Sequence, residues 1–67
     1  MTRAEQTRQA VASVGTITNQ GNPKRIEFMA DRPTTTDVLY DSMESPMGDG
    51  FRLIHIKGNH FAAVDGR

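Results

Sequence analysis

The chain has 67 residues, with eight basic and eight acidic side chains and no cysteine. This length allows a single domain, and a domain of this size buries only about 60 % of the surface that its unfolded chain exposes. The missing cysteine excludes disulfides and thiolate zinc sites, and the zero net charge argues against a general polyanion binder. Because small domains usually add a disulfide, a metal or a partner to their core, association with another chain is expected.

The first residues carry charge without an apolar stretch behind them, and no apolar run reaches the length that spans a bilayer. A chain without cysteine is compatible with a reducing compartment. These features predict a soluble, cytoplasmic protein with no membrane partner.

Residues 3–14 are predicted to form a helix. The segment from Thr2 to Glu5 fits a capping box, in which the threonine oxygen accepts from the glutamate amide and the glutamate reaches back. Small and apolar residues then recur at helical spacing along one face: Ala4, Thr7, Ala10, Val11 and Val14. This face is thin, so the helix needs a sheet to lie against.

Two short strands follow the helix. Residues 15–19 and 25–30 are rich in β-branched and alternating apolar residues, and residues 19–23 between them are dense in turn formers. The pattern predicts a hairpin.

Residues 34–44 fit two structures. Three successive threonines and the alternation of Thr36, Val38 and Tyr40 favour a strand over residues 34–41. The alternative is a second short helix over residues 36–44, capped by Thr36, with Leu39 and Met43 pointing inward. Residues 45–50 are a loop in either case.

The clearest pattern is a hairpin with strands at residues 51–56 and 60–65. Glycine and asparagine at positions 58 and 59 suit a tight hairpin turn. A two-residue turn pairs Lys57 with His60 and, at the far end, Arg52 with Asp65. In that register both faces have apolar centres, and His55 lies on the same face as His60.

Together these elements predict an α+β fold, with the N-terminal helix packed on a small antiparallel meander sheet of four to five strands. Residues 1–67 form one domain in this prediction. A partly closed barrel of the SH3-like or OB-like kind is the second arrangement compatible with the pattern.

The sequence lacks the motifs that carry catalysis. It has no phosphate-binding loop and no G-x-S-x-G nucleophile elbow, and the two histidines have no obvious third metal ligand. We therefore expect a non-enzymatic protein with no cofactor and no metal.

The leading hypothesis is a protein–protein interaction module that docks on a basic surface of a larger protein. Small inhibitors or regulators encoded by phages and mobile elements often work in this way. Acidic side chains concentrate in the middle of the chain, where the expected partner-binding residues are Asp37, Tyr40, Asp41, Glu44 and Asp49. Because a small chain has difficulty covering a hairpin that is apolar on both faces, a homo-oligomer interface is also expected, at Phe51, Leu53, His55 and Phe61.

The alternative is a domain that binds single-stranded nucleic acid. Its basic surface would combine Arg3, Arg8, Lys24, Arg25, Arg52 and Lys57. In this alternative Tyr40, Phe51 and Phe61 supply aromatic platforms on which bases stack.

Overall fold

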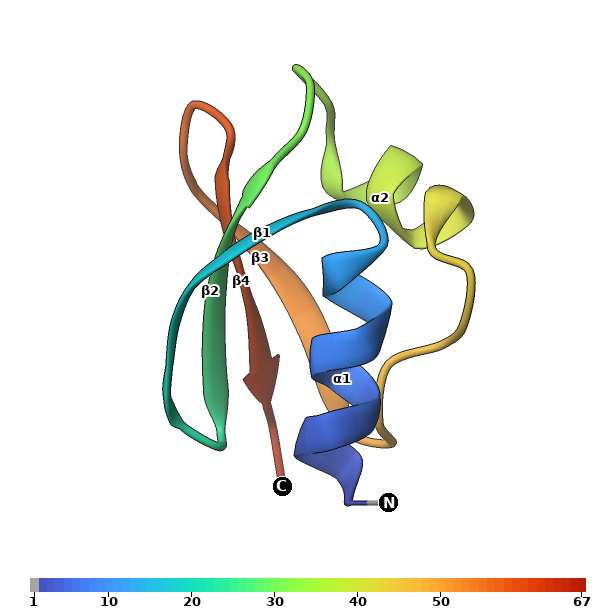
Figure 1. The fold of residues 1–67 in the computed structure, drawn as a ribbon, viewed down its shortest axis with the longest axis vertical. Helices are drawn as coiled ribbons and strands as arrows, with labels where there is room; N and C mark the ends of the chain where they lie inside the picture. The colour runs from blue at the N-terminus through green and yellow to red at the C-terminus, as the bar shows by residue number, and fades with distance from the viewer. Residues whose placement is uncertain (1) are drawn as a thin grey trace.

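The computed structural model describes residues 2–67, apart from the side chain of Gln20. Within them, two helices and a four-stranded antiparallel sheet form an α+β fold (Figure 1). The elements in chain order are α1 (Arg3–Ala12), β1 (Gly15–Asn22), β2 (Arg25–Ala30), α2 (Thr36–Ser42), β3 (Phe51–Lys57) and β4 (His60–Asp65). The expected fold class, with an N-terminal helix on an antiparallel sheet, is confirmed.

The sheet is open, and its strand order is β1-β2-β4-β3. Each hairpin pairs its own two strands, and the hairpins join where β2 runs antiparallel to β4. The strand nearest the C-terminus therefore lies inside the sheet, while β1 and β3 are its edges. In the described part of the chain no pairing joins β1 to β3, so the partly closed barrel is not formed.

Helix α1 begins as its capping box predicts. The Thr2 side chain accepts a hydrogen bond of 3.1 Å from the Glu5 backbone N–H, and its own hydroxyl contacts the Glu5 carboxylate at 3.1 Å. The helix ends at Ala12, two residues before the predicted end, with Ser13 as its C-cap. Three positions of the predicted inner face are fully buried: Thr7, Ala10 and Val11.

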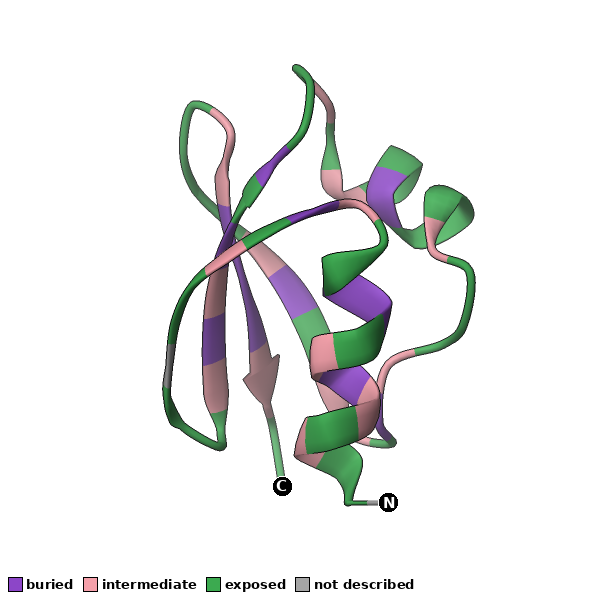
Figure 2. Cartoon of the chain, in the orientation of Figure 1, coloured by how far each residue is buried: buried purple, intermediate pink, exposed green. Residues whose placement is uncertain are grey.

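The core lies between the helices and one face of the sheet. Its buried members come from both helices and from three strands: Val11, Ile26, Phe28, Ala30, Leu39, Leu53, Phe61 and Ala63. The rings of Phe28 and Phe61 are stacked with centroids 6.1 Å apart. Along β2 buried positions alternate with more exposed ones, whereas three successive residues of β4, Phe61 to Ala63, are all buried (Figure 2).

The strand predicted for residues 34–41 is wrong, because residues 36–42 form the helix α2. Thr35, rather than Thr36, caps this helix and accepts from the Val38 backbone N–H at 3.4 Å. Leu39 is buried in the core, whereas Val38 is 52 % exposed. The threonine run thus acts as a cap and lead-in, and one inward leucine holds the helix to the core.

The C-terminal hairpin forms, but its predicted register holds only next to the turn. Lys57 pairs with His60 as predicted, and Gly58 has the positive φ of +55° that the turn needs. A bulge at Ile56 then shifts the pairing by one residue, so that Phe51, not Arg52, lies opposite Asp65.

This shift decides which side chains face the helices. Phe61 and Ala63 now share the core face with Leu53, so the hairpin has one buried face and one outer face. In cross-strand rows the outer face carries Arg25–Val64–Arg52, then Glu27–Ala62–Ile54, then Met29–His60–Lys57. Among the described residues, no helix is long and apolar enough to cross a membrane.

Candidate functional site

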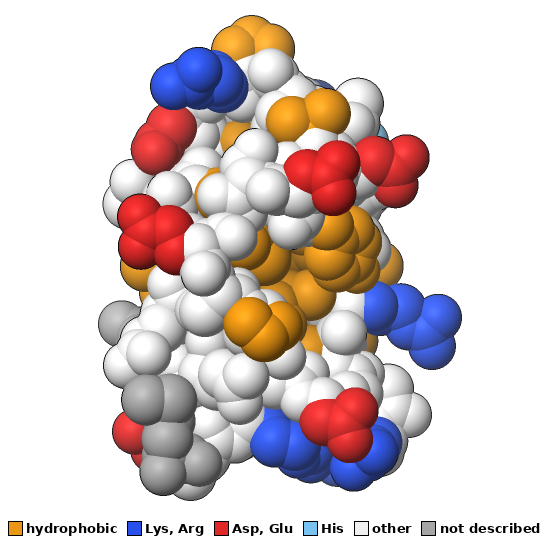
Figure 3. Space-filling model, turned by 90° about the vertical axis from the view of Figure 1, so that its right-hand side faces the viewer, with side chains coloured by type: hydrophobic (Ala, Val, Ile, Leu, Met, Phe, Trp, Pro, Cys, Tyr) orange, Lys and Arg blue, Asp and Glu red, His pale blue; other side chains and the backbone are white. Residues whose placement is uncertain are grey.

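An open cleft lies between α2, the loop of residues 43–50 and the start of β3. Its volume is about 470 Å³. Its apolar lining comes from Tyr40, Met43, Pro46, Met47 and Phe51. Figure 3 shows hydrophobic side chains gathered in the middle of this side of the molecule, with both acidic and basic side chains at several points around them.

The loop that forms one wall of the cleft is fastened to α1. The Gly48 backbone N–H donates a 2.9 Å hydrogen bond to the hydroxyl of Thr7, which is fully buried and itself donates to the Arg3 carbonyl at 2.8 Å. The Gln6 side-chain amide donates to the Pro46 carbonyl at 3.2 Å. These contacts join residues that lie 40 and 41 positions apart in the sequence and hold the loop in a defined position.

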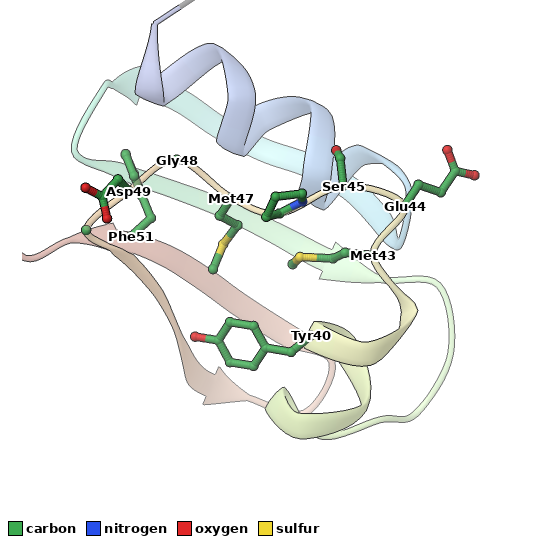
Figure 4. A pocket seen from close by; sticks show the side chains of 10 residues that line it. Tyr40, Met43, Glu44, Ser45, Met47, Gly48, Asp49 and Phe51 are labelled. Atoms are coloured by element: carbon green, nitrogen blue, oxygen red, sulfur yellow. The ribbon is translucent and has the colours of Figure 1, made fainter.

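Tyr40 forms the opposite wall and joins α2 to the edge strand. Its hydroxyl accepts a 2.7 Å hydrogen bond from the Leu53 backbone N–H, while 45 % of the residue stays exposed. Figure 4 shows the Tyr40 ring and the thioethers of Met43 and Met47 directed into the same space, whereas Glu44 points away from it. Because methionine side chains adapt to many shapes, such a lining suits a binding surface.

Two of the four predicted partner-binding carboxylates line the cleft, and the other two lie on the helix beside it. Glu44 and Asp49 belong to its lining, and Asp37 and Asp41 lie on the adjoining helix α2. All four are exposed. Asp37, Asp41 and Glu44 form no ion pair with another described residue, whereas Asp49 contacts the guanidinium of Arg67.

A cluster of Arg3, Asp49 and Asp65 links α1 to the end of β4. The Arg3 guanidinium lies 2.9 Å from the Asp65 carboxylate and donates to the Asp49 carbonyl at 2.8 Å. The hydrogen bond that the Arg3 guanidinium donates to the Asp65 carboxylate, together with the one from the backbone N–H of Arg67, holds the pKa of Asp65 below its usual value.

The residues expected at an oligomer interface do not form one surface. Phe61 is fully buried and Leu53 is 7 % exposed, because both belong to the core. Phe51 is half-buried and lines the cleft. His55 is exposed, with its ring 4.9 Å from that of Phe61 on the core side, whereas His60 lies on the outer face beside Glu27, 3.2 Å away. The prediction that the two histidines share a face is therefore wrong, since the bulge places them on different faces.

The residues expected to bind nucleic acid are also divided. Arg25 and Arg52 flank Val64 on the outer face of the sheet, and Lys57 lies two rows away. Arg8 belongs to α1, on the opposite side, and Lys24 lies in the turn between β1 and β2. The aromatic side chains named with them do not reach the outer face: Phe61 is in the core, and Tyr40 and Phe51 line the cleft.

Three participants in the site were not predicted from the sequence. Pro46 and Met47 lie in a segment read only as a loop, and Arg67 was given no role. Two methionines four positions apart in a run of acidic residues were the available signal for an apolar cleft. Nothing in the sequence indicated the contact between Arg67 and Asp49, because it depends on where the last strand ends.

The described residues contain no group of three or more histidine, cysteine, aspartate or glutamate side chains that could hold a metal ion.

In comparisons with known proteins, no family model, no curated protein and no solved structure matches the chain.

Proposed function

We propose that this protein is a small non-enzymatic interaction module that uses the cleft and its acidic surroundings to dock on a basic surface of a larger protein. The observation that supports it is the combination of an apolar floor with exposed carboxylates at Asp37, Asp41, Glu44 and Asp49. A complementary partner presents an apolar side chain to the floor and basic side chains around it.

The two parts of the site contribute differently to binding. Burying one leucine-sized side chain in the cleft contributes about 1.5–3 kcal/mol. Exposed carboxylates add little to affinity individually, but they speed encounter with a basic partner and disfavour acidic ones. The fastening of the loop to Thr7 favours binding further, because less chain has to be ordered on association.

A module of this kind can act as an inhibitor or regulator. If the basic surface on the partner is itself a nucleic-acid groove, the acidic side of this domain occupies the place of the phosphates. The phage or mobile-element setting and the cytoplasmic location are parts of the same proposal.

The test is a capture experiment from host lysate, with and without nuclease. The double variant Asp37→Lys/Asp41→Lys is compared with wild type, and Asp31→Lys is the control because Asp31 is an exposed carboxylate that belongs neither to α2 nor to the lining of the cleft. We expect the wild-type protein and the control to retain a nuclease-resistant protein partner that the double variant loses. Retention of the same partner by the folded double variant would refute the proposal.

The alternative, binding of single-stranded nucleic acid, has one supporting observation. Arg25 and Arg52 lie in the same row of the outer face, separated only by Val64. Arg25 is partly neutralised by Glu27, at 3.3 Å, and no aromatic side chain lies in the three cross-strand rows for bases to stack on. In a salt titration with labelled oligonucleotides, this alternative requires that Arg25→Glu/Arg52→Glu weaken binding and reduce the salt slope.

A further inference from the structure

The rim of the cleft already holds one guanidinium, that of Arg67. After β4 the chain turns back along the loop, where the Gly66 N–H donates to the Gly50 carbonyl at 3.0 Å and the Arg67 N–H donates to Asp65 at 3.0 Å. The Arg67 side chain then reaches Asp49 and pairs with its carboxylate. The backbone of Asp49 is fixed separately by Arg3, so its carboxylate stays at the rim whether or not Arg67 is bound.

The ion pair between Arg67 and Asp49 is weak enough for another basic group to replace Arg67. The side chains are 60 % and 76 % exposed, and an exposed ion pair of this kind stabilises a protein by at most about 1 kcal/mol. The backbone hydrogen bonds of residues 65–67 do not depend on it. Arg67 can therefore release Asp49 into solvent without disturbing the fold.

We propose that Arg67 is an internal competitor for the partner. In the bound state an arginine of the partner takes Asp49 in place of Arg67, and an apolar side chain near that arginine enters the cleft between Met47 and Phe51. This inference rests on the proposed function and specifies the chemistry of the partner: a segment in which an apolar residue stands close to an arginine.

Arginine is favoured over lysine because its planar fork matches a carboxylate and its charge is more weakly hydrated. The rim accommodates a guanidinium, since that of Arg67 lies against Asp49 there. The neighbouring carboxylates of α2 then attract further basic residues of the same segment without requiring a defined pairing.

The test uses a short fluorescein-labelled peptide of leucine, arginine, serine and glycine, with matched peptides in which lysine or glutamine replaces every arginine. Binding is measured by anisotropy at low salt against wild type, Arg67→Gln, Asp49→Asn, the Arg67→Gln/Asp49→Asn double variant and Arg32→Gln. Arg32→Gln removes an exposed positive charge that forms no ion pair with the other described residues. It therefore reports the general effect of net charge. Thermal unfolding shows that each variant remains folded.

We expect Arg67→Gln to bind the arginine peptide about two- to five-fold more tightly than Arg32→Gln does, the ratio that corresponds to an exposed pair of up to about 1 kcal/mol. Asp49→Asn should weaken binding of the arginine peptide. Adding Arg67→Gln to Asp49→Asn should raise the affinity by no more than Arg32→Gln raises that of wild type. The arginine peptide should bind more tightly than the lysine peptide to wild type, and about equally with it to Asp49→Asn.

Equal affinities of Arg67→Gln and Arg32→Gln would overturn the inference, as would an unchanged affinity of Asp49→Asn. Absence of binding by every peptide would overturn it as well. Each of these results leaves the lysate capture and its dependence on Asp37 and Asp41 untouched, so the inference can fail while the proposed function stands.

Discussion

Single contacts fix the walls of the cleft, and the contact between Thr7 and Gly48 is the most buried of those that hold the loop. Thr7 is a polar residue with no exposed surface, and it uses its hydroxyl twice, as donor to Arg3 and as acceptor from Gly48. Position 48 also approaches the helix so closely that a side chain has no room. One buried hydroxyl thus fixes the middle of the loop, in addition to the contacts of Gln6 with Pro46 and of Arg3 with Asp49.

We predict that Gly48→Ala destabilises the domain and loosens the loop. A Cβ at this position would lie 2.4 Å from the Arg3 carbonyl oxygen and 2.8 Å from its Cα, and overpacking of this kind costs about 1–3 kcal/mol. Urea unfolding measures the loss. Gly21→Ala is the matched control, because its Cβ would meet nothing closer than 3.7 Å. An equal stability of the two variants would contradict the account of the loop.

Asp65 is predicted to make part of the stability depend on pH. Its pKa is lowered, chiefly by the hydrogen bond from Arg3, so its stabilising effect is complete above the unfolded-state pKa of about 3.9. The effect is lost as the pH falls from there through the lowered folded-state pKa. Wild type should be more stable than Asp65→Asn at pH 7, and this advantage should shrink by pH 3. Denaturant titrations of both proteins at both pH values measure this advantage. A difference in stability that stays the same at the two pH values would show that the charge of Asp65 is not involved.

At the scale of elements, the edge strand β3 is covered by its neighbours along its first half. The Phe51 N–H donates to the Gly48 carbonyl at 3.1 Å, and the Leu53 N–H donates to the Tyr40 hydroxyl. An uncovered edge would invite pairing with another strand. Helix α2 therefore shields the sheet edge with the same tyrosine that lines the cleft.

Tyr40→Phe tests this coupling of α2 to β3. The substitution keeps the ring and removes the acceptor for Leu53, which should cost about 1 kcal/mol and leave the edge N–H open to water. Hydrogen exchange at the Leu53 amide should accelerate, while exchange at Phe51, whose acceptor is unchanged, serves as the internal control. Unaltered exchange at Leu53 would mean that the hydroxyl does not protect the strand.

Local patterns predicted those elements whose signals agree with their surroundings. The capping box at Thr2, the buried face through Ala10 and Val11, and the turn at Gly58 are all local features, and the structure confirms them. The threonine run at 34–36 was misleading because threonine has high β propensity and is also a good helix cap, and only burial of Leu39 decides between these roles.

The candidate site was predicted only in part. Exposure of the acidic residues follows from their chemistry, so Asp37, Asp41, Glu44 and Asp49 were placed on the surface correctly. The bulge at Ile56 leaves no mark in the sequence, yet it separates His55 from His60 and sends Phe61 into the core. The cleft itself depends on long-range contacts such as that between Thr7 and Gly48, which a local pattern cannot show.

At the scale of the whole molecule, basic side chains predominate on the outer face of the sheet, whereas the cleft side carries acidic side chains together with the guanidiniums of Arg3 and Arg67. The outer face of the sheet carries Arg25, Arg52 and Lys57 with a single carboxylate, that of Glu27, in the three cross-strand rows. The acidic residues of α2 and the following loop lie in the two segments that border the cleft. The zero net charge therefore conceals two surfaces that attract different partners, and the site of binding identifies which of them is used.

The most direct measurement is a chemical-shift titration of the ¹⁵N-labelled domain with the leucine–arginine peptide. We predict that perturbed amides cluster at the cleft, in α2 and in the segment from Met43 to Phe51. Perturbations confined to Arg25, Ala62 and Val64 on the outer face, or none at all, would contradict it.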